Sequence, residues 1–231
     1  MRTLTQTDLL ALWESGRSRH WLDQGVLAVE TASAEAQENV ADWPLGRRNR
    51  ALLEIHARIF GGPLRGWAAC PRCAEKLEFE LDARTLAAGL EGEQEATVEV
   101  DGERFRLPTS RDLAALIGEG DATQAARSLL RRLHTAGGAA WSDAEMEAFG
   151  ERLAEADPLA EIRIGFTCLS CGEVFAESLE LPSFVWSELE ARARRVLAEV
   201  HELALAYGWS EAEILRLTPA RRELYLETVR G

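Results

Sequence analysis

Apolar residues recur every three or four positions over much of the chain, which is the spacing of one face of an α-helix. The longest such pattern lies near the C-terminus and forms one seam: Trp186, Leu189, Ala193, Val196, Val200, Leu203 and Tyr207. Gly208 follows directly and is typical of a helix C-terminus. We therefore expect one long helix here, whose seam packs either on the rest of the chain or on a partner protein.

Several shorter helices have recognisable first residues. Thr5, Ser142 and Ser210 each precede an acidic residue by three positions, which is the pattern of a capping box. We expect further helices with apolar residues on one face, beginning near Pro44, Ser110, Asp121 and Pro219. The pattern weakens between residues 18 and 43, where the acidic, alanine-rich stretch 31–39 fits either a loose helix or a linker.

Alternating apolar and polar residues indicate short β-strands. Residues 76–81 alternate after a first cysteine pair, and residues 162–166 and 174–181 flank a second pair. Between them, two alternating stretches meet at Asp101-Gly102, a dipeptide typical of a two-residue hairpin turn. We expect these small β elements to gather around the first cysteine pair.

The four cysteines of the chain form two Cys-x-x-Cys pairs, Cys70 with Cys73 and Cys168 with Cys171. Zn²⁺ in structural sites prefers four such ligands in a tetrahedron. Two Cys-x-x-Cys turns between strands, facing each other, complete that set and resemble a zinc ribbon. The sequence therefore predicts a structural Zn²⁺ site, in which Cys70 and Cys171 are neighbours in space.

The separation of the two pairs does not exclude a shared site. Although 94 residues lie between Cys73 and Cys168, the entropy of loop closure grows only with the logarithm of length, and a folded insertion brings its own ends together. Two alternatives remain open, namely redox-active thiols and unliganded thiols. A catalytic zinc is disfavoured because four thiolates leave no position for water or substrate.

These patterns together predict an α+β fold. We expect a small zinc-ribbon-like antiparallel β region with a helical insertion, and helical arms at the N- and C-termini. The expected parts are an N-terminal helical region at 1–66, a split zinc-ribbon region at 67–181 with its insertion at about 110–157, and a C-terminal helical region at 182–231. Zinc would then fix the start of the long C-terminal helix.

The charge of the chain narrows the class of partner. The formal net charge is −13, and such a field repels both nucleic acid and anionic lipid. We therefore expect protein partners. Arginines on the helix after Pro44 are expected to form a solvated face or to pair with carboxylates: Arg47, Arg48, Arg50 and Arg58.

The location of the protein bears on its cysteines. The first residues lack the apolar core of a signal peptide, and no apolar run approaches the roughly 20 residues that cross a bilayer. We expect a cytoplasmic protein without a membrane partner. A reducing compartment disfavours disulfides and makes metal ligation the preferred interpretation of paired cysteines.

Residue patterns typical of enzymes are sparse. The four histidines are scattered and belong to neither a metalloprotease helix nor a nucleophile elbow: His20, His56, His134 and His201. Gly61-Gly62-Pro63 follows an expected helix and does not open one, so it does not match a phosphate-binding loop. We expect no catalytic residues.

Two groups of short stretches carry a family resemblance. Residues 43–53 (WPLGRRNRALL), 60–62 (FGG) and 70–73 (CPRC) resemble the baseplate hub assembly chaperones of T-even-like contractile phage tails. Residues 199–204 (EVHELA), 207–211 (YGWSE) and 214–215 (IL) are similar to relatives encoded with phage-tail-like contractile injection systems. The resemblance implies a non-enzymatic role in baseplate assembly, with baseplate or tail proteins as partners.

The seam of the long helix is the candidate partner-binding surface: Trp186, Leu189, Val196, Val200, Leu203 and Tyr207. Packing of this seam within the chain is the competing interpretation. An alternative function is a zinc-ribbon transcriptional regulator with a helix-turn-helix-like C-terminus that carries Arg216, Arg221 and Arg222. A thiol redox protein is a third.

Overall fold

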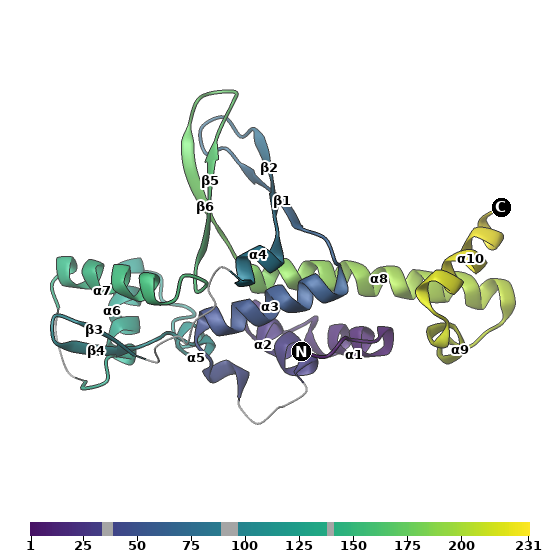
Figure 1. Cartoon of the computed structure of the whole chain (residues 1–231), viewed down its shortest axis with the longest axis horizontal. Helices are drawn as coiled ribbons and strands as arrows, with labels where there is room; N and C mark the ends of the chain where they lie inside the picture. The colour runs from purple at the N-terminus through teal and green to yellow at the C-terminus, as the bar shows by residue number, and fades with distance from the viewer. Residues whose placement is uncertain (34–38, 89–96, 138–140) are drawn as a thin grey trace.

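A computed structural model of the protein describes residues 1–33, 39–88, 97–137 and 141–231 (Figure 1). The fold is α+β, as expected, and is extended along one long helix, α8 (Leu181–Tyr207). With 27 residues, α8 is about 40 Å long. A helical body lies along one part of α8, an arm of β-strands projects from it, and a small lobe lies at each end of the molecule (Figure 1).

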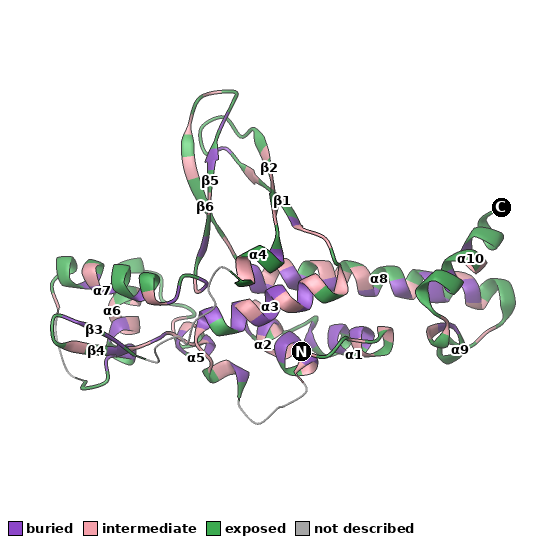
Figure 2. Cartoon of the chain, viewed as in Figure 1, coloured by how far each residue is buried: buried purple, intermediate pink, exposed green. Residues whose placement is uncertain are grey.

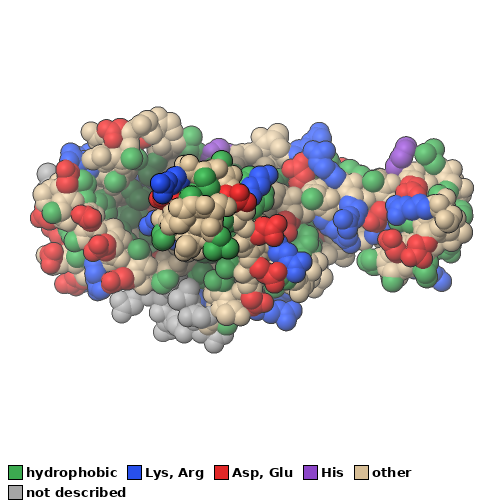
Figure 3. All heavy atoms as spheres, turned by 90° about the horizontal axis from the view of Figure 1, so that it is seen from above, with side chains coloured by type: hydrophobic (Ala, Val, Ile, Leu, Met, Phe, Trp, Pro, Cys, Tyr) green, Lys and Arg blue, Asp and Glu red, His purple; other side chains and the backbone are tan. Residues whose placement is uncertain are grey.

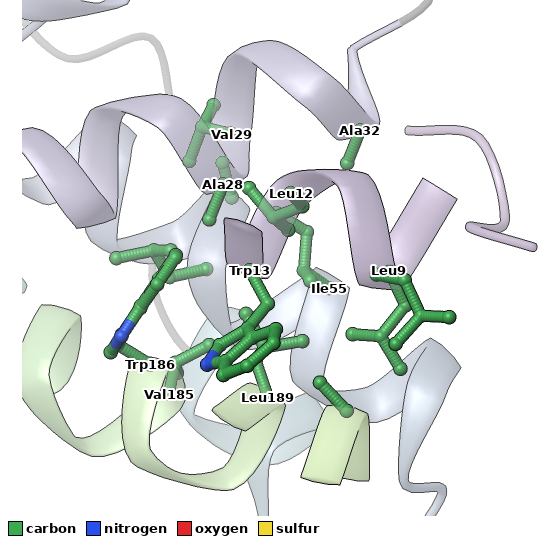
Figure 4. Packing of buried hydrophobic residues seen from close by; sticks show 14 of the residues in the cluster. Leu9, Leu12, Trp13, Ala28, Val29, Ala32, Ile55, Val185, Trp186 and Leu189 are labelled. Carbon is green, nitrogen blue, oxygen red and sulfur yellow. The ribbon is translucent and has the colours of Figure 1, made fainter. Parts of the chain in front are cut away.

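The body consists of α1 (Gln6–Gly16), α2 (Trp21–Ala32) and α3 (Leu45–Ile59), which pack against α8 around the main hydrophobic core. Figure 4 shows Trp13 of α1 beside Leu189 of α8 in this core. Buried residues concentrate where these helices meet, whereas the arm is mostly half-buried or exposed (Figure 2). The body is therefore the part of the chain in which apolar burial supplies most of the stability.

The seam of α8 packs inside the protein, which corrects the expectation that it is a surface for a partner. Five of its six candidate residues are at most 8% exposed: Trp186, Leu189, Val196, Val200 and Leu203. Their side chains fill the core with α1, α2 and α3 and, farther along, the C-terminal lobe. Tyr207 alone is 38% exposed, and it stacks on Trp209 and contacts Tyr225.

The C-terminal lobe is formed by α9 (Glu211–Arg216) and α10 (Pro219–Arg230), which fold back toward the end of α8 (Figure 1). The turn at the end of α8 needs a left-handed residue, and Gly208 supplies it with a φ of +69°. Ile214 and Leu226 are both fully buried and join the lobe to the main core.

The opposite lobe has a second core of its own. The hairpin of β3 (Thr97–Val100) and β4 (Glu103–Arg106) packs on α6 (Ala122–Leu133) and α7 (Asp143–Ala156), with Phe105 fully buried between them. The expectation that this hairpin gathers around the first cysteine pair is therefore wrong. The alternation of apolar and polar residues predicts the two strands correctly. It does not predict which hydrophobic core their apolar side chains join.

The arm consists of two antiparallel hairpins. β1 (Leu64–Ala69) pairs with β2 (Lys76–Leu81), and β5 (Ile162–Thr167) pairs with β6 (Val174–Leu179). Figure 1 shows the two hairpins side by side, with both turns at the far end of the arm. Only one residue separates β6 from α8, so the second hairpin continues directly into the long helix.

Directly after β4, the chain is held by the start of α3 at Pro108 and Ser110. The backbone N–H of Leu45 donates to the carbonyl of Pro108 at 2.9 Å, and the Arg48 guanidinium donates to the Ser110 hydroxyl at 2.9 Å. Ser110 begins α5 (Ser110–Ala114). Burial lowers the pKa of Arg48 to about 10, partly offset by Glu180 and Asp157, so the group stays charged at neutral pH.

The chain returns from the second lobe to the same helix. The backbone N–H of Gly46 donates to the Asp157 carboxylate at 2.9 Å, and the Asn49 side-chain amide donates to the carbonyl of Leu159 at 2.7 Å. A Cβ at position 46 would lie 1.7 Å from the Asp157 carboxylate, so this approach requires glycine. The start of α3 thus binds both ends of the segment 110–157. The long loop between the two cysteine pairs is therefore closed by these contacts as well as by the cysteines.

Most predicted elements are confirmed. Capping boxes form at Thr5, Ser142 and Ser210. The cap of α5 is Thr109, one residue before the expected Ser110. Within the undecided stretch, α2 and a short turn η1 (Val40–Asp42) form, and residues 34–38 lie outside the described residues. Two elements, β1 and α4 (Ala83–Ala88), were not among those expected, and α4 packs against α3.

Candidate metal centre

The first cysteine pair lies in the tight turn that joins β1 to β2. The backbone N–H of Cys70 donates to the carbonyl of Glu75 at 2.8 Å, and the N–H of Ala74 donates back to the carbonyl of Cys70 at 2.9 Å. These two bonds fold the turn so that Cys70 and Cys73 both lie at the end of the hairpin. Ala74 takes a left-handed conformation, with a φ of +61°.

The second pair repeats this geometry at the end of the β5–β6 hairpin. The N–H of Cys168 donates to the carbonyl of Glu173 at 2.8 Å, and the N–H of Gly172 donates to the carbonyl of Cys168 at 2.8 Å. Gly172 occupies the position equivalent to Ala74, with a φ of +75°. A left-handed conformation costs nothing for glycine but about 1 kcal/mol or more for alanine. The two turns are therefore alike in shape, and only the second has the preferred residue.

The four sulfur atoms converge at the ends of the two hairpins. The Sγ atoms of Cys70 and Cys171 are 3.6 Å apart, as are those of Cys73 and Cys168, and all four lie within 4.8 Å of one another. A disulfide would need about 2.05 Å, so the four thiols are free. A tetrahedron with Zn–S bonds of about 2.3 Å has edges of about 3.8 Å. The arrangement therefore matches a four-thiolate metal site, and the predicted closeness of Cys70 and Cys171 is confirmed.

The thiols differ in burial and in acidity. Cys70 and Cys168 are buried between the hairpins, whereas Cys73 is exposed. Burial would raise the pKa of Cys70, but the backbone N–H groups of Cys73 and Arg72, with the neighbouring thiols, lower it to about 7. For Cys171, the N–H of Glu173 lowers the pKa, yet burial and the other three thiols outweigh it and raise the pKa to about 12.

This spread of acidity follows from crowding four ionisable sulfurs. One thiolate forms easily, and its charge opposes the ionisation of the next, so the group titrates as a coupled set. A bound dication offsets that repulsion and favours the fully deprotonated state. The donor set of four sulfurs is also that of a closed structural site, with no position left for a substrate.

Aromatic rings pack the two hairpins together beneath the sulfurs. Phe79 of the first hairpin meets Phe166 of the second edge to face at 6.3 Å between ring centroids, and Phe166 stacks on Phe175 at 5.3 Å. The ring of Phe79 lies across Gly66, where a Cβ would be only 2.5 Å from it. Between the hairpins lies a largely apolar pocket of about 550 Å³, and Phe184 of α8 is among the residues that line it.

No protein-family model, curated protein or solved structure matches the chain. Among the described residues, the four cysteines are the one group of three or more His, Cys, Asp or Glu side chains close enough to share a metal ion. No helix in the described ranges combines the length and apolar character needed to span a bilayer.

The four histidines lie apart from the cysteine centre and have separate local roles. His56 is buried, with Nε2 2.6 Å from the Glu188 carboxylate, and His134 lies 2.5 Å from Glu103. The ring of His20 caps α2, and His201 is exposed on α8. His56 and His134 thus take part in buried contacts, and His201 lies at the surface.

Several of the arginines that were expected to form a solvated face or to contact DNA take part in contacts within the fold. Arg47 stacks over Trp43 at 3.9 Å, and Arg48 belongs to the buried contact that holds the insertion. In the C-terminal lobe, Arg222 is 1% exposed and pairs with Glu199 at 2.7 Å. Only Arg216 and Arg221 of the predicted helix-turn-helix arginines face solvent.

Two features of the arm were not predicted. Trp67 on β1 is 57% exposed, with the Lys76 ammonium 4.4 Å from its ring. Leu169, between the cysteines of the second turn, is 97% exposed. The segment 64–69 reads LRGWAA, which lacks the alternation that identifies a strand, so neither the strand nor its exposed tryptophan could be found by that criterion.

Proposed function

We propose that this protein is a non-enzymatic assembly chaperone or structural component of the baseplate of a contractile phage tail or phage-tail-like injection system. It acts through protein–protein contacts on a scaffold that a structural Zn²⁺ holds together. The observation that carries the zinc assignment is the convergence of four sulfurs at distances of 3.6 Å within each facing pair. The tail assignment rests on the family resemblance of the stretches 43–53, 60–62, 70–73, 199–204, 207–211 and 214–215.

The proposed ion would act as a cross-link. Cys70 and Cys73 would hold it from one hairpin and Cys168 and Cys171 from the other, which joins two turns with 94 residues between them in the sequence. Four thiolate bonds supply folding free energy, which reaches about 10–16 kcal/mol for structural zinc in small peptides. Because β6 runs into α8 with one residue between them, the cross-link also fixes the arm relative to the body.

The shape of the molecule supports a role in binding other proteins. The arm carries exposed apolar side chains, Trp67 and Leu169, beyond the core of the body. Exposed aromatic and apolar groups of this kind are typical of contact surfaces between proteins. A closed four-thiolate centre adds rigidity to such an arm without adding chemistry.

Two measurements test the proposal. Metal analysis of protein purified under reducing conditions is expected to give about one zinc per chain, and less than about half an equivalent with rapid thiol alkylation would contradict the closed site. Co-purification with sheath, tube and baseplate proteins of a contractile tail tests the assembly role. Recovery of DNA and no tail protein would instead favour the transcriptional regulator, and a DNA titration over a range of salt concentrations measures this.

A further inference from the structure

A recess lined by arginines lies between α8 and α10. Its volume is about 320 Å³, and the guanidinium groups of Arg192, Arg195, Arg222 and Arg230 line it together with two carboxylates, those of Glu199 and Glu223. The chain as a whole is acidic, with 39 acidic and 26 basic residues. A recess with more arginines than carboxylates therefore differs from the overall charge of the protein. Figure 3 shows basic side chains gathered on the neck between the body and the C-terminal lobe.

Two of these arginines are neutralised within the protein. Arg222 is buried and donates to the Glu199 carboxylate at 2.7 Å. Arg230 binds the Glu202 carboxylate with two hydrogen bonds, of 3.0 and 2.9 Å. These pairs hold α10 on α8 and account for two of the carboxylates near the recess.

The other two arginines have no such partner. Within the described ranges, neither Arg192 nor Arg195 makes a hydrogen bond or an ion pair. They lie three residues apart on α8 and hence on one side of it, and like charges at this spacing destabilise a helix by a few tenths of a kcal/mol. Their neighbour Arg194, by contrast, is paired with Glu190 at 2.7 Å.

The carboxylates that would normally pair with these two arginines are engaged elsewhere. Glu188 lies one helical turn before Arg192, but its carboxylate is 2.6 Å from Nε2 of the buried His56. Glu199 lies one turn after Arg195, but it pairs with Arg222. Glu223 on the opposite wall is the one lining carboxylate with no ion pair in the part of the chain that the structure describes. Two guanidinium groups therefore stay available to a ligand.

We propose that this recess binds the carboxylate side chains of a short acidic segment of a partner protein. Guanidinium groups bind carboxylates through charge-assisted, often bidentate hydrogen bonds. A long polyanion such as DNA is disfavoured because the net charge of −13 repels it, whereas a few acidic side chains fit a recess of this size. The inference goes beyond the proposed function, because it does not depend on zinc or on a tail partner.

The test uses the full chain and a fluorescein-labelled hexaglutamate peptide, with binding followed by fluorescence anisotropy at low ionic strength. The double variant Arg192→Gln/Arg195→Gln removes both charges, and glutamine has nearly the helix propensity of arginine, so α8 is retained. We expect the peptide to bind the variant about tenfold more weakly, as the loss of charge-assisted hydrogen bonds worth at least 1.4 kcal/mol predicts.

The matched control is Arg131→Gln/Arg163→Gln, which removes two exposed arginines that have no ion pair among the described residues. It changes the net charge equally and is expected to keep the affinity within about twofold. Equal weakening in both double variants, or no binding of the peptide by the wild-type chain, would overturn the proposal. The proposal would also be overturned if an oligothymidylate of the same charge bound more tightly than the peptide and if this binding required Arg192 and Arg195.

Discussion

Replacement of Cys168 by serine tests whether the four cysteines cross-link the arm. Cys168 is 1% exposed, and its Sγ lies 3.6 Å from that of Cys73. Serine preserves the size of the side chain but removes one thiolate ligand, so the variant is expected to lose tightly bound zinc. The body should remain folded, because its core lies in α1, α2, α3 and α8.

The size of the effect depends on which transition is measured. When the whole chain unfolds, a link between Cys73 and Cys168 closes a loop of nearly 100 residues, which corresponds to about 4.7 kcal/mol. When only the arm opens, the bond from Asn49 to Leu159 still holds the insertion. The loop then runs through about 33 residues, and the same relation gives about 3.7 kcal/mol.

Hydrogen exchange separates these two transitions. In Cys168→Ser, amides in the strands of the arm are expected to exchange up to about 500-fold faster, which is the factor that corresponds to about 3.7 kcal/mol. Amides in the middle of α8 should keep their protection. Leu169→Ser is the matched control, since this neighbouring side chain is 97% exposed and offers no sulfur. Unchanged exchange in the arm of Cys168→Ser, with or without metal, would refute the cross-link.

Three further predictions address the turns, the core and the response to acid. Ala74 and Gly172 both have a positive φ, which glycine adopts without strain and alanine does not. In chemical denaturation, Ala74→Gly is therefore expected to stabilise the arm by about 0.5–1 kcal/mol, and Gly172→Ala to destabilise it by about 1 kcal/mol. Effects of the same sign would contradict this geometry. Leu189→Ala should cost about 2–5 kcal/mol by the same measurement, whereas Leu205→Ala, at a position 75% exposed, should cost less than about 0.5 kcal/mol. Burial would raise the pKa of Asp112, but Arg106 and Thr109 lower it to about 2. The carboxylate therefore stabilises the fold above its unfolded pKa near 3.8, and this stabilisation is lost as the pH falls from about 4 to 2. Asp112→Asn is expected to be less stable at neutral pH by about 2.5 kcal/mol and to lose less stability in acid, which thermal unfolding across this pH range would measure.

The sequence predicts local structure well where one rule applies at a time. Caps, hairpin turns and the three-and-four spacing depend on residues close together in the chain, and Thr5, Ser142 and Ser210 cap their helices as expected. The four cysteines could be grouped because metal chemistry imposes a ligand number that two pairs complete. The caps and turns could be predicted from neighbouring residues, and the metal site from the number of ligands that zinc requires, so neither prediction needs the tertiary structure.

What could not be predicted is which surfaces meet. A seam such as that of Leu189 and Val196 looks the same in sequence whether it is covered by α1 and α2 or by another protein. The β3–β4 hairpin likewise has an apolar face that fits either core. The structure places Phe105 against Phe149, with ring centroids 4.7 Å apart, in a core separate from that of the body. The partner of an apolar face is decided by the tertiary arrangement, which periodicity does not encode.

The start of α3 explains why the two halves of the metal centre tolerate so large an insertion. Gly46 and Asn49 bind the returning chain at Asp157 and Leu159, only about ten residues before the second cysteine pair. The insertion can therefore vary in length without changing the loop that the cysteines close when the arm opens. Residues 43–53, at the start of α3, thus hold this junction. Their residue pattern follows from a structural requirement, namely a glycine that admits a carboxylate and polar side chains that satisfy buried backbone groups.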